Sequence, residues 1–272
     1  MTARIIRLLF AILLTAVPAL AAADLLDDIK ARGTLVVGVK DATPPFGFIS
    51  PESRSVVGYD VDFAAAIARE LGVELRLVPV TTATRVPELT QGKIDLIIAT
   101  MTHTKQRERQ IDFSHTYFMT GQKLLVHRDS GVRSVADLRG KRVSSVRGST
   151  SEQNIRRAVP GVRVVSFNDY PNAFLALAQR KVAAMTTDEI ILMNFHQRAP
   201  DPEMFLLPDE YISTEPYGIG VRKGQPALLN AVNRILEQME ASGEAAKIHA
   251  KWFGPDTDTP LKRTFRIGPA NL

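Results

Sequence analysis

The stretch Asp95–Ser114, DLIIATMTHTKQRERQIDFS, joins an apolar run, a threonine-rich loop and a basic turn. Its apolar residues Leu96–Ile98 predict a short strand that is buried on both faces. Thr100 and Thr102 follow the carboxyl end of that strand, where open α/β sheets bind ligands. Arg107 follows within two helical turns, so hydroxyl and guanidinium groups can converge on a small anion, which we interpret as a carboxylate. The alternative is that this arginine is an ordinary solvated surface residue.

The first 23 residues differ from the rest of the 272-residue chain. Arg4 and Arg7 precede the apolar run 8–17, and small residues follow it up to Ala23. This pattern predicts a signal peptide over residues 1–23, cleaved after Ala21 or Ala23. No later stretch approaches the roughly 18 apolar residues of a spanning helix, so we expect a soluble, exported protein.

Composition narrows the class of protein further. The chain contains no Cys, so we expect neither disulfides nor a lipoprotein anchor, and we place the protein free in a periplasm. The formal charge of +5 becomes 5 − 2 = +3 without Arg4 and Arg7, and it is spread along the chain. Such spreading argues against a nucleic-acid partner. The five scattered His residues show no metal-type spacing, so we expect no metal and no cofactor. The sequence gives no sign of an oligomer, so we expect a monomer.

Strands and helices alternate along the chain, which predicts parallel sheets with right-handed crossovers. A first set of strands is expected at 35–39, 73–80 and 95–98, and a second set at 142–146, 162–167 and 183–185. Extended segments at 113–126 and 211–221 are expected to cross between two domains. In the helix that follows Gly58, we expect Asp60 or Asp62 to cap the start. The tail after Gly254, with three prolines, is expected to be a loose extension.

Polar residues follow the other strands of the first set as well. Lys40 comes directly after the first strand, where it either faces a ligand or lies in an exposed turn. Thr82 and Arg85 come after the second strand, which again places a hydroxyl and a guanidinium beyond a carboxyl end. These residues are therefore candidates for the same site.

The second set of strands offers its own candidates. Ser149 and Thr150 open a helix, whose free N–H groups can bind an anion, although a simple N-cap explains them equally well. Asp188 ends a buried strand, where it either receives an ammonium group or caps the next helix.

Several motifs together resemble the bacterial extracellular solute-binding proteins, family 3, which are periplasmic receptors of polar amino-acid uptake systems. The likeness runs from about residue 35 to residue 254. The motifs are GYDVDFAAAIAREL at 58–71, PPF at 44–46, GK-x-D-L at 92–96, R-x-R-x-x-D-F-S at 107–114 and KWFG at 251–254.

The resemblance implies a two-lobed α/β protein of the type II periplasmic-binding-protein fold. Each lobe is expected to hold a mostly parallel sheet flanked by helices, and two hinge strands are expected to join the lobes. Lobe 1 is expected to comprise residues 24–119 and 215–254, lobe 2 residues 120–214, and a C-terminal extension residues 255–272.

The resemblance also implies roles for individual residues. It places the grip on the α-carboxylate of an amino acid at Arg107 and the acceptor of its α-ammonium at Asp188, assisted by the backbone carbonyl near Thr100. A bidentate guanidinium suits a carboxylate, and a buried Asp suits an ammonium once both are paired. Further support for the carboxylate is expected from Thr102 and from a hydroxyl or N–H at Ser149 or Thr150.

The stretch TTATRVPEL at 81–89 resembles the glutamate/aspartate receptors of the family, and it contains Thr82 and Arg85. Lys40 stands where those receptors place a cation. Two cations near one end of the cleft favour a second carboxylate, so we expect glutamate or aspartate as the ligand. The sequence departs from that pattern, because Lys40 replaces an expected arginine and Tyr170 an expected histidine. Glutamine and asparagine therefore remain alternatives.

The implied function is capture of one amino acid by lobe closure and its delivery to the permease and ATPase of an inner-membrane ABC transporter. One alternative is an enzyme that resembles this family, a periplasmic cyclohexadienyl dehydratase, with Asp188 or Glu189 as its acid. Another is the sensing domain of a receptor kinase, against which the lack of a further hydrophobic span argues.

Overall fold

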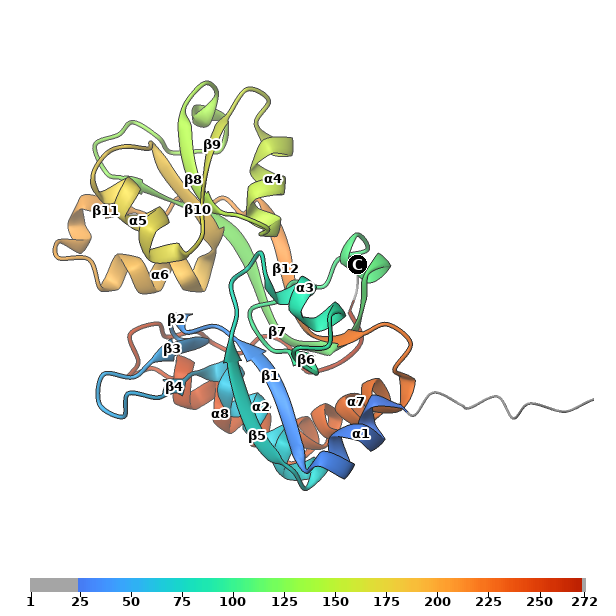
Figure 1. Cartoon of the computed structure of the whole chain (residues 1–272). Helices are drawn as coiled ribbons and strands as arrows, with labels where there is room; N and C mark the ends of the chain where they lie inside the picture. Colours follow the sequence, from blue (N-terminus) through green and yellow to red (C-terminus); the bar gives the residue numbers. More distant parts are fainter. Residues whose placement is uncertain (1–23, 271–272) are drawn as a thin grey trace, which may run out of the picture.

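Two long strands join the two lobes of the molecule. The computed structural model describes residues 24–270, so the predicted signal peptide, residues 1–23, lies outside the described part. β7 (Ile111–His127) and β12 (Ser213–Arg222) run through the waist between the lobes (Figure 1). They pair antiparallel along β12. These are the two predicted crossing segments, and the predicted lobe boundaries at 119/120 and 214/215 fall inside them.

The hinge strands merge the sheets of the two lobes into one. Lobe 1 contains β1 (Thr34–Val39), β5 (Glu74–Pro79) and β6 (Leu96–Ile97), and lobe 2 contains β8 (Arg142–Val146), β9 (Arg163–Phe167), β10 (Ala184–Asp188) and β11 (Phe205–Leu206). The strand order is β5-β1-β6-β12-β7-β10-β8-β9, with β11 paired to β7. In each lobe three strands are parallel, and the hinge strands join them antiparallel. The predicted parallel sets are present, because each parallel pair is connected by a long crossover.

Helices cover both lobes, and α2, α7 and α8 pack against one another in lobe 1 (Figure 1). Lobe 1 holds α1 (Leu25–Arg32), α2 (Tyr59–Leu71), α3 (Arg85–Thr90), α7 (Pro226–Ala241) and α8 (Glu244–Phe253), and lobe 2 holds α4 (Thr150–Ala158), α5 (Tyr170–Ala178) and α6 (Glu189–Gln197). Single 3₁₀ turns are η1 (Arg107–Arg109), η2 (Ala136–Leu138) and η3 (Pro202–Met204). A small sheet consists of β2 (Ala42–Thr43), β3 (Gly47–Ile49) and β4 (Val56–Val57).

A cluster of aromatic side chains fixes the hinge strands to lobe 1. Phe46, from the loop after β2, packs edge-on against Phe118 of β7 with ring centroids 4.9 Å apart, and it also contacts Tyr217 of β12. All three side chains are fully buried. Each such side chain contributes roughly 1.5–3 kcal/mol by its burial. The cluster therefore holds the loop at 44–46 rigidly against the strands that lead into the cleft.

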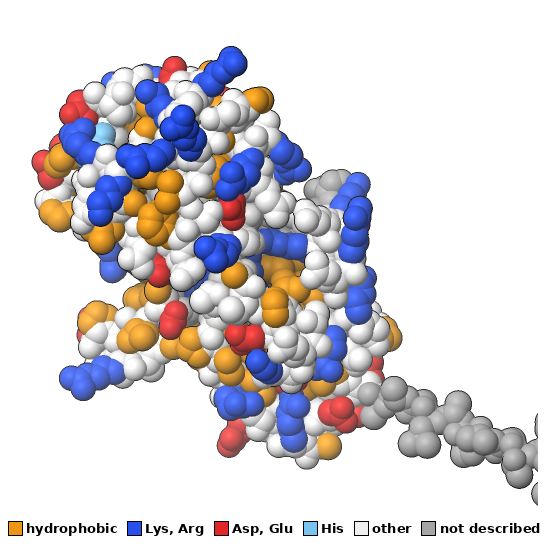
Figure 2. Space-filling view, turned by 45° about the horizontal axis from the view of Figure 1, so that its top comes forward, with side chains coloured by type: hydrophobic (Ala, Val, Ile, Leu, Met, Phe, Trp, Pro, Cys, Tyr) orange, Lys and Arg blue, Asp and Glu red, His pale blue; other side chains and the backbone are white. Residues whose placement is uncertain are grey.

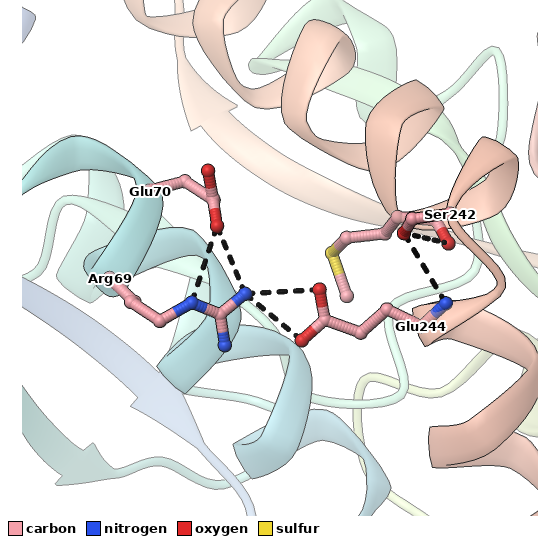
Figure 3. Close-up of polar contacts among 5 residues, drawn as sticks. Arg69, Glu70, Ser242 and Glu244 are labelled. Atoms are coloured by element: carbon pink, nitrogen blue, oxygen red, sulfur yellow. Dashed lines mark hydrogen bonds and ion pairs between the residues drawn. The ribbon is translucent and has the colours of Figure 1, made fainter.

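An ion-pair cluster links the ends of α2 and α8 on the surface. Figure 3 shows Arg69 between Glu70 and Glu244, and its guanidinium lies 3.0 Å from a carboxylate oxygen of each. The Arg69 side chain is 57% exposed, so solvent screens this cluster and we assign it little stability. Buried contacts hold these helices together instead, such as that between Tyr59 of α2 and Phe253 of α8, whose ring centroids are 5.3 Å apart.

The prediction of a loose tail is wrong for the described residues after Gly254. The backbone N–H of Thr116 on β7 donates to the carbonyl of Gly268 at 2.7 Å, so the tail adds to the edge of β7. Glu240 of α7 accepts hydrogen bonds from the Arg263 guanidinium and, at 3.1 Å, from the Ile267 N–H. These contacts are one isolated backbone bridge and the bonds of a single carboxylate rather than a periodic pattern, and sequence reasoning therefore missed them.

Candidate functional site

A cleft lies between the two lobes at the carboxyl ends of the strands. Figure 2 shows the surface hollowed there, with Lys or Arg and hydrophobic side chains at the floor of the hollow. The cavity has a volume of about 730 Å³, and residues of both lobes line it. Of the nine predicted site residues, five line the cavity: Thr82, Arg85, Thr102, Arg107 and Thr150. The other four are buried and are not part of its lining: Lys40, Thr100, Ser149 and Asp188.

Arg107 spans the cleft from its place in η1. Its Nη1 donates to the carbonyl of Thr102 at 2.7 Å, and its Nη2 donates to the carbonyl of Gly148 in lobe 2 at 3.1 Å. Burial lowers the pKa of Arg107 to about 9, with the nearby charge of Arg85 acting in the same direction. Both hydrogen-bond acceptors are neutral, so this guanidinium is available for an anion in the cleft.

Asp188, at the end of β10 in lobe 2, is an acidic residue near the Arg107 guanidinium. It occupies the N-cap position of α6 but makes no capping hydrogen bond with its side chain. Its Oδ2 accepts from the Tyr217 hydroxyl, and its Oδ1 is buried without a partner among residues 24–270. Burial raises the pKa of Asp188 to about 7, and the charge of Glu215 adds to the rise. A buried carboxylate oxygen without a partner is costly, and an incoming ammonium group would satisfy it.

Two further cations lie near this pair. Arg85 is 2% exposed, its Nη1 donates to the carbonyls of Ala99 and Thr100, and its Nε has no partner in the described chain. The Nζ of Lys40 donates to Oγ1 of Thr82 at 2.7 Å. Burial lowers the pKa of both residues, and that of Lys40 falls well below its usual value. The Thr100 carbonyl, which we expected to assist in binding the ligand's ammonium, thus already accepts a hydrogen bond from Arg85.

The loop after β6 is held by a residue whose role was predicted wrongly. Asp60 does not cap α2, because the N-cap is Gly58. Its Oδ2 accepts from the N–H of Thr100 at 2.9 Å, and its Oδ1 accepts from the Tyr117 hydroxyl at 2.7 Å. Thr100 has a φ of +48°, which is unfavourable for a β-branched residue, so these bonds fix a strained loop at the site. Burial raises the pKa of Asp60 to about 7.

The hydroxyls at the start of α4 already have partners. Oγ of Ser149 accepts from the N–H of Glu152 at 3.1 Å, which is the N-cap arrangement left open as an alternative. Oγ1 of Thr150 donates to Glu215 at 2.6 Å and lies 3.5 Å from Oγ1 of Thr102. Thr150 of lobe 2 therefore contacts both the hinge strand β12 and lobe 1 at the cleft.

Sequence reasoning missed the polar residues of hinge strand β12. Glu215 is 1% exposed and accepts hydrogen bonds from Thr150, from Asn154 at 3.0 Å and from Ser213 at 2.6 Å. A glutamate inside the otherwise extended, largely apolar segment 211–221 was a signal that could have identified it.

Other kinds of site find no support in the part of the chain that is described. Among those residues, no three His, Cys, Asp or Glu side chains are grouped so as to hold a metal ion. No helix in residues 24–270 has the length and apolar character needed to cross a membrane.

Comparison with known proteins gives consistent relatives. The chain is 41% identical over 237 residues to the ABC transporter glutamine-binding protein GlnH of Bacillus subtilis (strain 168), covering 86% of each chain. It is 30% identical over 239 residues to the L-glutamate/L-aspartate-binding protein of Pseudomonas aeruginosa, covering 84% of this chain and 79% of the relative.

Among solved structures, the ancestral amino acid-binding protein AncCDT-1, a precursor of cyclohexadienyl dehydratase, matches with a TM-score of 0.78 and 35% identity. The match covers 84% of this chain and 99% of that chain. The predicted two-lobed type II fold of periplasmic binding proteins is thereby confirmed. The model of the bacterial extracellular solute-binding proteins, family 3, matches residues 35–255. With the fold, the cleft and this match in agreement, the chain belongs to the bacterial extracellular solute-binding proteins, family 3.

Proposed function

We propose that this protein captures one polar amino acid between its lobes and delivers it to an ABC-type uptake system. The observation that carries the proposal is that Arg107 and Asp188 belong to different lobes, are close enough for their charges to interact, and both lack a charged hydrogen-bond partner in the described chain. A free amino acid offers a carboxylate and an ammonium group on one carbon. It would satisfy both residues at once.

Closure follows from the same arrangement. A ligand that contacts both lobes binds the closed form more tightly than the open form, and this difference in affinity shifts the population toward closure. In the structure, Arg107 already reaches Gly148 across the cleft. We propose that lobe 1 and lobe 2 divide at 119/120 and 214/215, so that β7 and β12 bend during closure.

For the ligand's side chain we propose a carboxylate, as in glutamate or aspartate. Arg85 and Lys40 are nearly fully buried cations without a carboxylate at ion-pair distance within the described residues. A buried cation is stabilised most by an anion that it can bond directly. The glutamate/aspartate-binding relative agrees with this choice.

Glutamine is the second candidate ligand, and a specific observation favours it. The Bacillus subtilis relative at 41% identity is a glutamine-binding protein. The carbonyl of a side-chain amide would accept hydrogen bonds from Arg85 or Lys40, although it would leave their charge uncompensated.

We further propose that the protein acts as a monomer in the periplasm after removal of residues 1–23, without a cofactor or nucleic acid. Its partners would be the permease and ATPase of the transporter, as the names of ABC-transporter relatives suggest. We propose binding without catalysis. Because a structural relative is a precursor of cyclohexadienyl dehydratase, an assay for prephenate turnover is the direct check, and we expect none.

Calorimetric titration with the common amino acids tests the proposed ligand. We expect glutamate or aspartate to bind most tightly, and we expect Arg85→Ala and Lys40→Ala each to reduce the preference for glutamate over glutamine. Arg109→Ala is the control, because Arg109 is exposed in the same turn as Arg107. If glutamate affinity is unchanged in both site variants, these cations do not recognise the side chain; if glutamine binds most tightly, the second candidate is correct.

A further inference from the structure

Two buried aspartates each accept a hydrogen bond from a tyrosine, but they differ in their second oxygen. Asp60 uses both oxygens, accepting from Tyr117 at 2.7 Å and from the N–H of Thr100 at 2.9 Å. Asp188 accepts from the Tyr217 hydroxyl at Oδ2, whereas its Oδ1 is buried with no partner in the described chain. Asp60 is therefore complete without a ligand, and Asp188 is not.

The hydroxyl of Tyr217 is held in place by its surroundings. The side chain is fully buried, and its ring lies 5.5 Å from that of Phe46 and 5.7 Å from that of Phe118. Its backbone lies in hinge strand β12 and forms a bridge with Thr102. Asp188, in contrast, ends β10 in lobe 2. The hydrogen bond thus connects a rigid aromatic cluster at the hinge to the carboxylate of the opposite lobe.

We propose that Tyr217 is a positioning residue of the amino-acid site, which keeps Asp188 ionised and directs its free oxygen toward the ligand's ammonium. This inference rests on the proposed function, in which Asp188 pairs with that ammonium. Tyr217 itself would not touch the ligand. Its effect would be on the charge and orientation of the group that does.

The charged groups around Asp188 determine how much the Tyr217 hydroxyl contributes to the ionisation of Asp188. Glu215 on β12 disfavours ionisation, Arg85 on α3 and Arg107 on η1 favour it, and the Tyr170 hydroxyl of α5 also lies near. Burial raises the pKa of Asp188 to about 7, and the hydrogen bond from Tyr217 opposes that rise. Without this bond the pKa would be higher, so a larger fraction of Asp188 would be neutral at pH 7.

The sign of the effect on binding follows directly. Only the ionised carboxylate pairs with an ammonium group, so affinity falls as the pH drops through the pKa of Asp188. Removing the Tyr217 hydroxyl moves this fall to higher pH. A shift of one pH unit corresponds to about a tenfold loss of affinity below the midpoint and to little loss well above it.

The test is calorimetric titration with L-glutamate and L-glutamine between pH 5.5 and 8.5 on the wild type, Tyr217→Phe, Tyr211→Phe and Asp188→Asn. Tyr211→Phe is the control, since it removes a tyrosine hydroxyl that donates to the neighbouring carboxylate of Glu189, and Tyr211 is 54% exposed and outside the cavity lining. We expect Tyr217→Phe to raise the midpoint pH of affinity by about one unit and to recover affinity near pH 8.5. Tyr211→Phe should leave the midpoint unchanged, and Asp188→Asn should bind weakly at every pH.

The outcomes distinguish an error in the proposed function of Asp188 from an error in the proposed role of Tyr217. If the wild type binds no amino acid, or Asp188→Asn binds like the wild type with the same pH profile, the proposed function of Asp188 is wrong. If Asp188→Asn loses binding while Tyr217→Phe keeps the wild-type midpoint, or weakens affinity equally at all pH values, the role of Tyr217 is wrong. Should Tyr217→Phe not fold, NMR of the ligand-free wild type follows the Tyr217 hydroxyl proton instead. Its bond to Asp188 must protect this proton from exchange, and its chemical shift must follow the titration of Asp188. A Tyr217 hydroxyl proton that exchanges freely, or whose shift does not follow that titration, overturns the inference.

Discussion

Arg107 lines the cleft from lobe 1, and Asp188 is buried in lobe 2 outside the lining of the cavity. Neither residue has a charged hydrogen-bond partner in the described chain. Arg107→Lys keeps the charge but loses the planar donor pair that matches a carboxylate. A hydrogen bond to a charged group contributes about 1.5–3 kcal/mol, so the loss of one of the two should lower affinity for the preferred amino acid about tenfold or more.

Calorimetry measures this change, and Arg109→Lys is the control because Arg109 is exposed. An Arg107→Lys protein that binds as tightly as the wild type would show that the guanidinium does not hold the carboxylate.

The pH dependence of stability offers a second test at Asp188. Its pKa is about 7 in the folded protein and close to 4 when unfolded. Between these values the folded state binds more protons, so ligand-free stability contributed by this group falls as the pH rises from about 4 to about 7. Asp188→Asn removes this fall. Between pH 5 and pH 8 we therefore expect the variant to gain roughly 1–3 kcal/mol relative to the wild type.

Urea unfolding of both ligand-free proteins at the two pH values measures that difference. The comparison with the variant is needed because burial lowers the pKa of His249 to about 4, which makes stability rise with pH over part of the same range. A stability difference between variant and wild type that is equal at pH 5 and pH 8 would contradict the raised pKa of Asp188.

The sequence identified those site residues that follow strand ends. Arg85, Arg107 and Asp188 could be found because carboxyl ends of parallel strands meet at one edge of a sheet. Asp60 and Glu215 could not, because their partners lie far away in the chain: Tyr117 is 57 residues from Asp60, and Thr150 is 65 residues from Glu215. Pairing at such separations depends on the completed fold.

At the scale of elements, the C-terminal tail is attached to lobe 1 by Glu240 of α7. The side chain of Glu240 is 11% exposed and accepts from both Arg263 and the N–H of Ile267. Arg263 holds the pKa of Glu240 below its usual value. Glu240→Gln should cost roughly 1–3 kcal/mol, since it weakens a charge-assisted bond and disturbs its neighbour.

Thermal denaturation checks this prediction, and we expect a Tm lower by about 2–4 °C for each kcal/mol lost. Glu237→Gln on the same helix is the control, because Glu237 is 60% exposed and, among residues 24–270, pairs only with His115. Equal melting temperatures for the two variants would mean that the tail contributes nothing through Glu240.

Helices whose apolar residues repeat with a clear helical spacing were predicted well, and segments too short to show such a repeat were not. In α2, Phe63 and Ile67 lie four residues apart and are both buried, and Gly72 ends the helix with a φ of +71°. Apolar residues at this spacing and a closing glycine are patterns that sequence alone shows. Val135 and Leu138 are spaced as on a helix, but residues 136–138 form only a 3₁₀ turn, η2. Its few residues offer less than two turns of pattern, which is too short to distinguish the two kinds of helix.

For the whole molecule, Gly148 tests whether closure matters for binding. It belongs to lobe 2, and a Cβ on it would lie 3.1 Å from Cα of Ala83 and 3.2 Å from the carbonyl oxygen of Thr82 in lobe 1. Gly140 has a similar φ, +74° against +79°, but nothing lies within 4 Å of its Cβ position. Gly148→Ala and Gly140→Ala therefore share the backbone strain, and only the first obstructs the lobes.

We expect both glycine variants to lose similar stability and only Gly148→Ala to lose affinity, by about tenfold. Thermal denaturation and calorimetric titration measure the two quantities on the same samples. Equal affinities for the two variants would show that the lobes need not approach this closely to hold the ligand.

Recognition of both charged ends of an amino acid is tested most directly by titrating the wild-type protein with its tightest-binding amino acid and with two derivatives of it. One derivative is N-acetylated, which removes the ammonium that Asp188 is proposed to bind, and the other is decarboxylated, which removes the carboxylate proposed for Arg107. We predict that each derivative binds about 100-fold or more weakly than the parent amino acid. Binding of either derivative within tenfold of the parent would contradict this recognition.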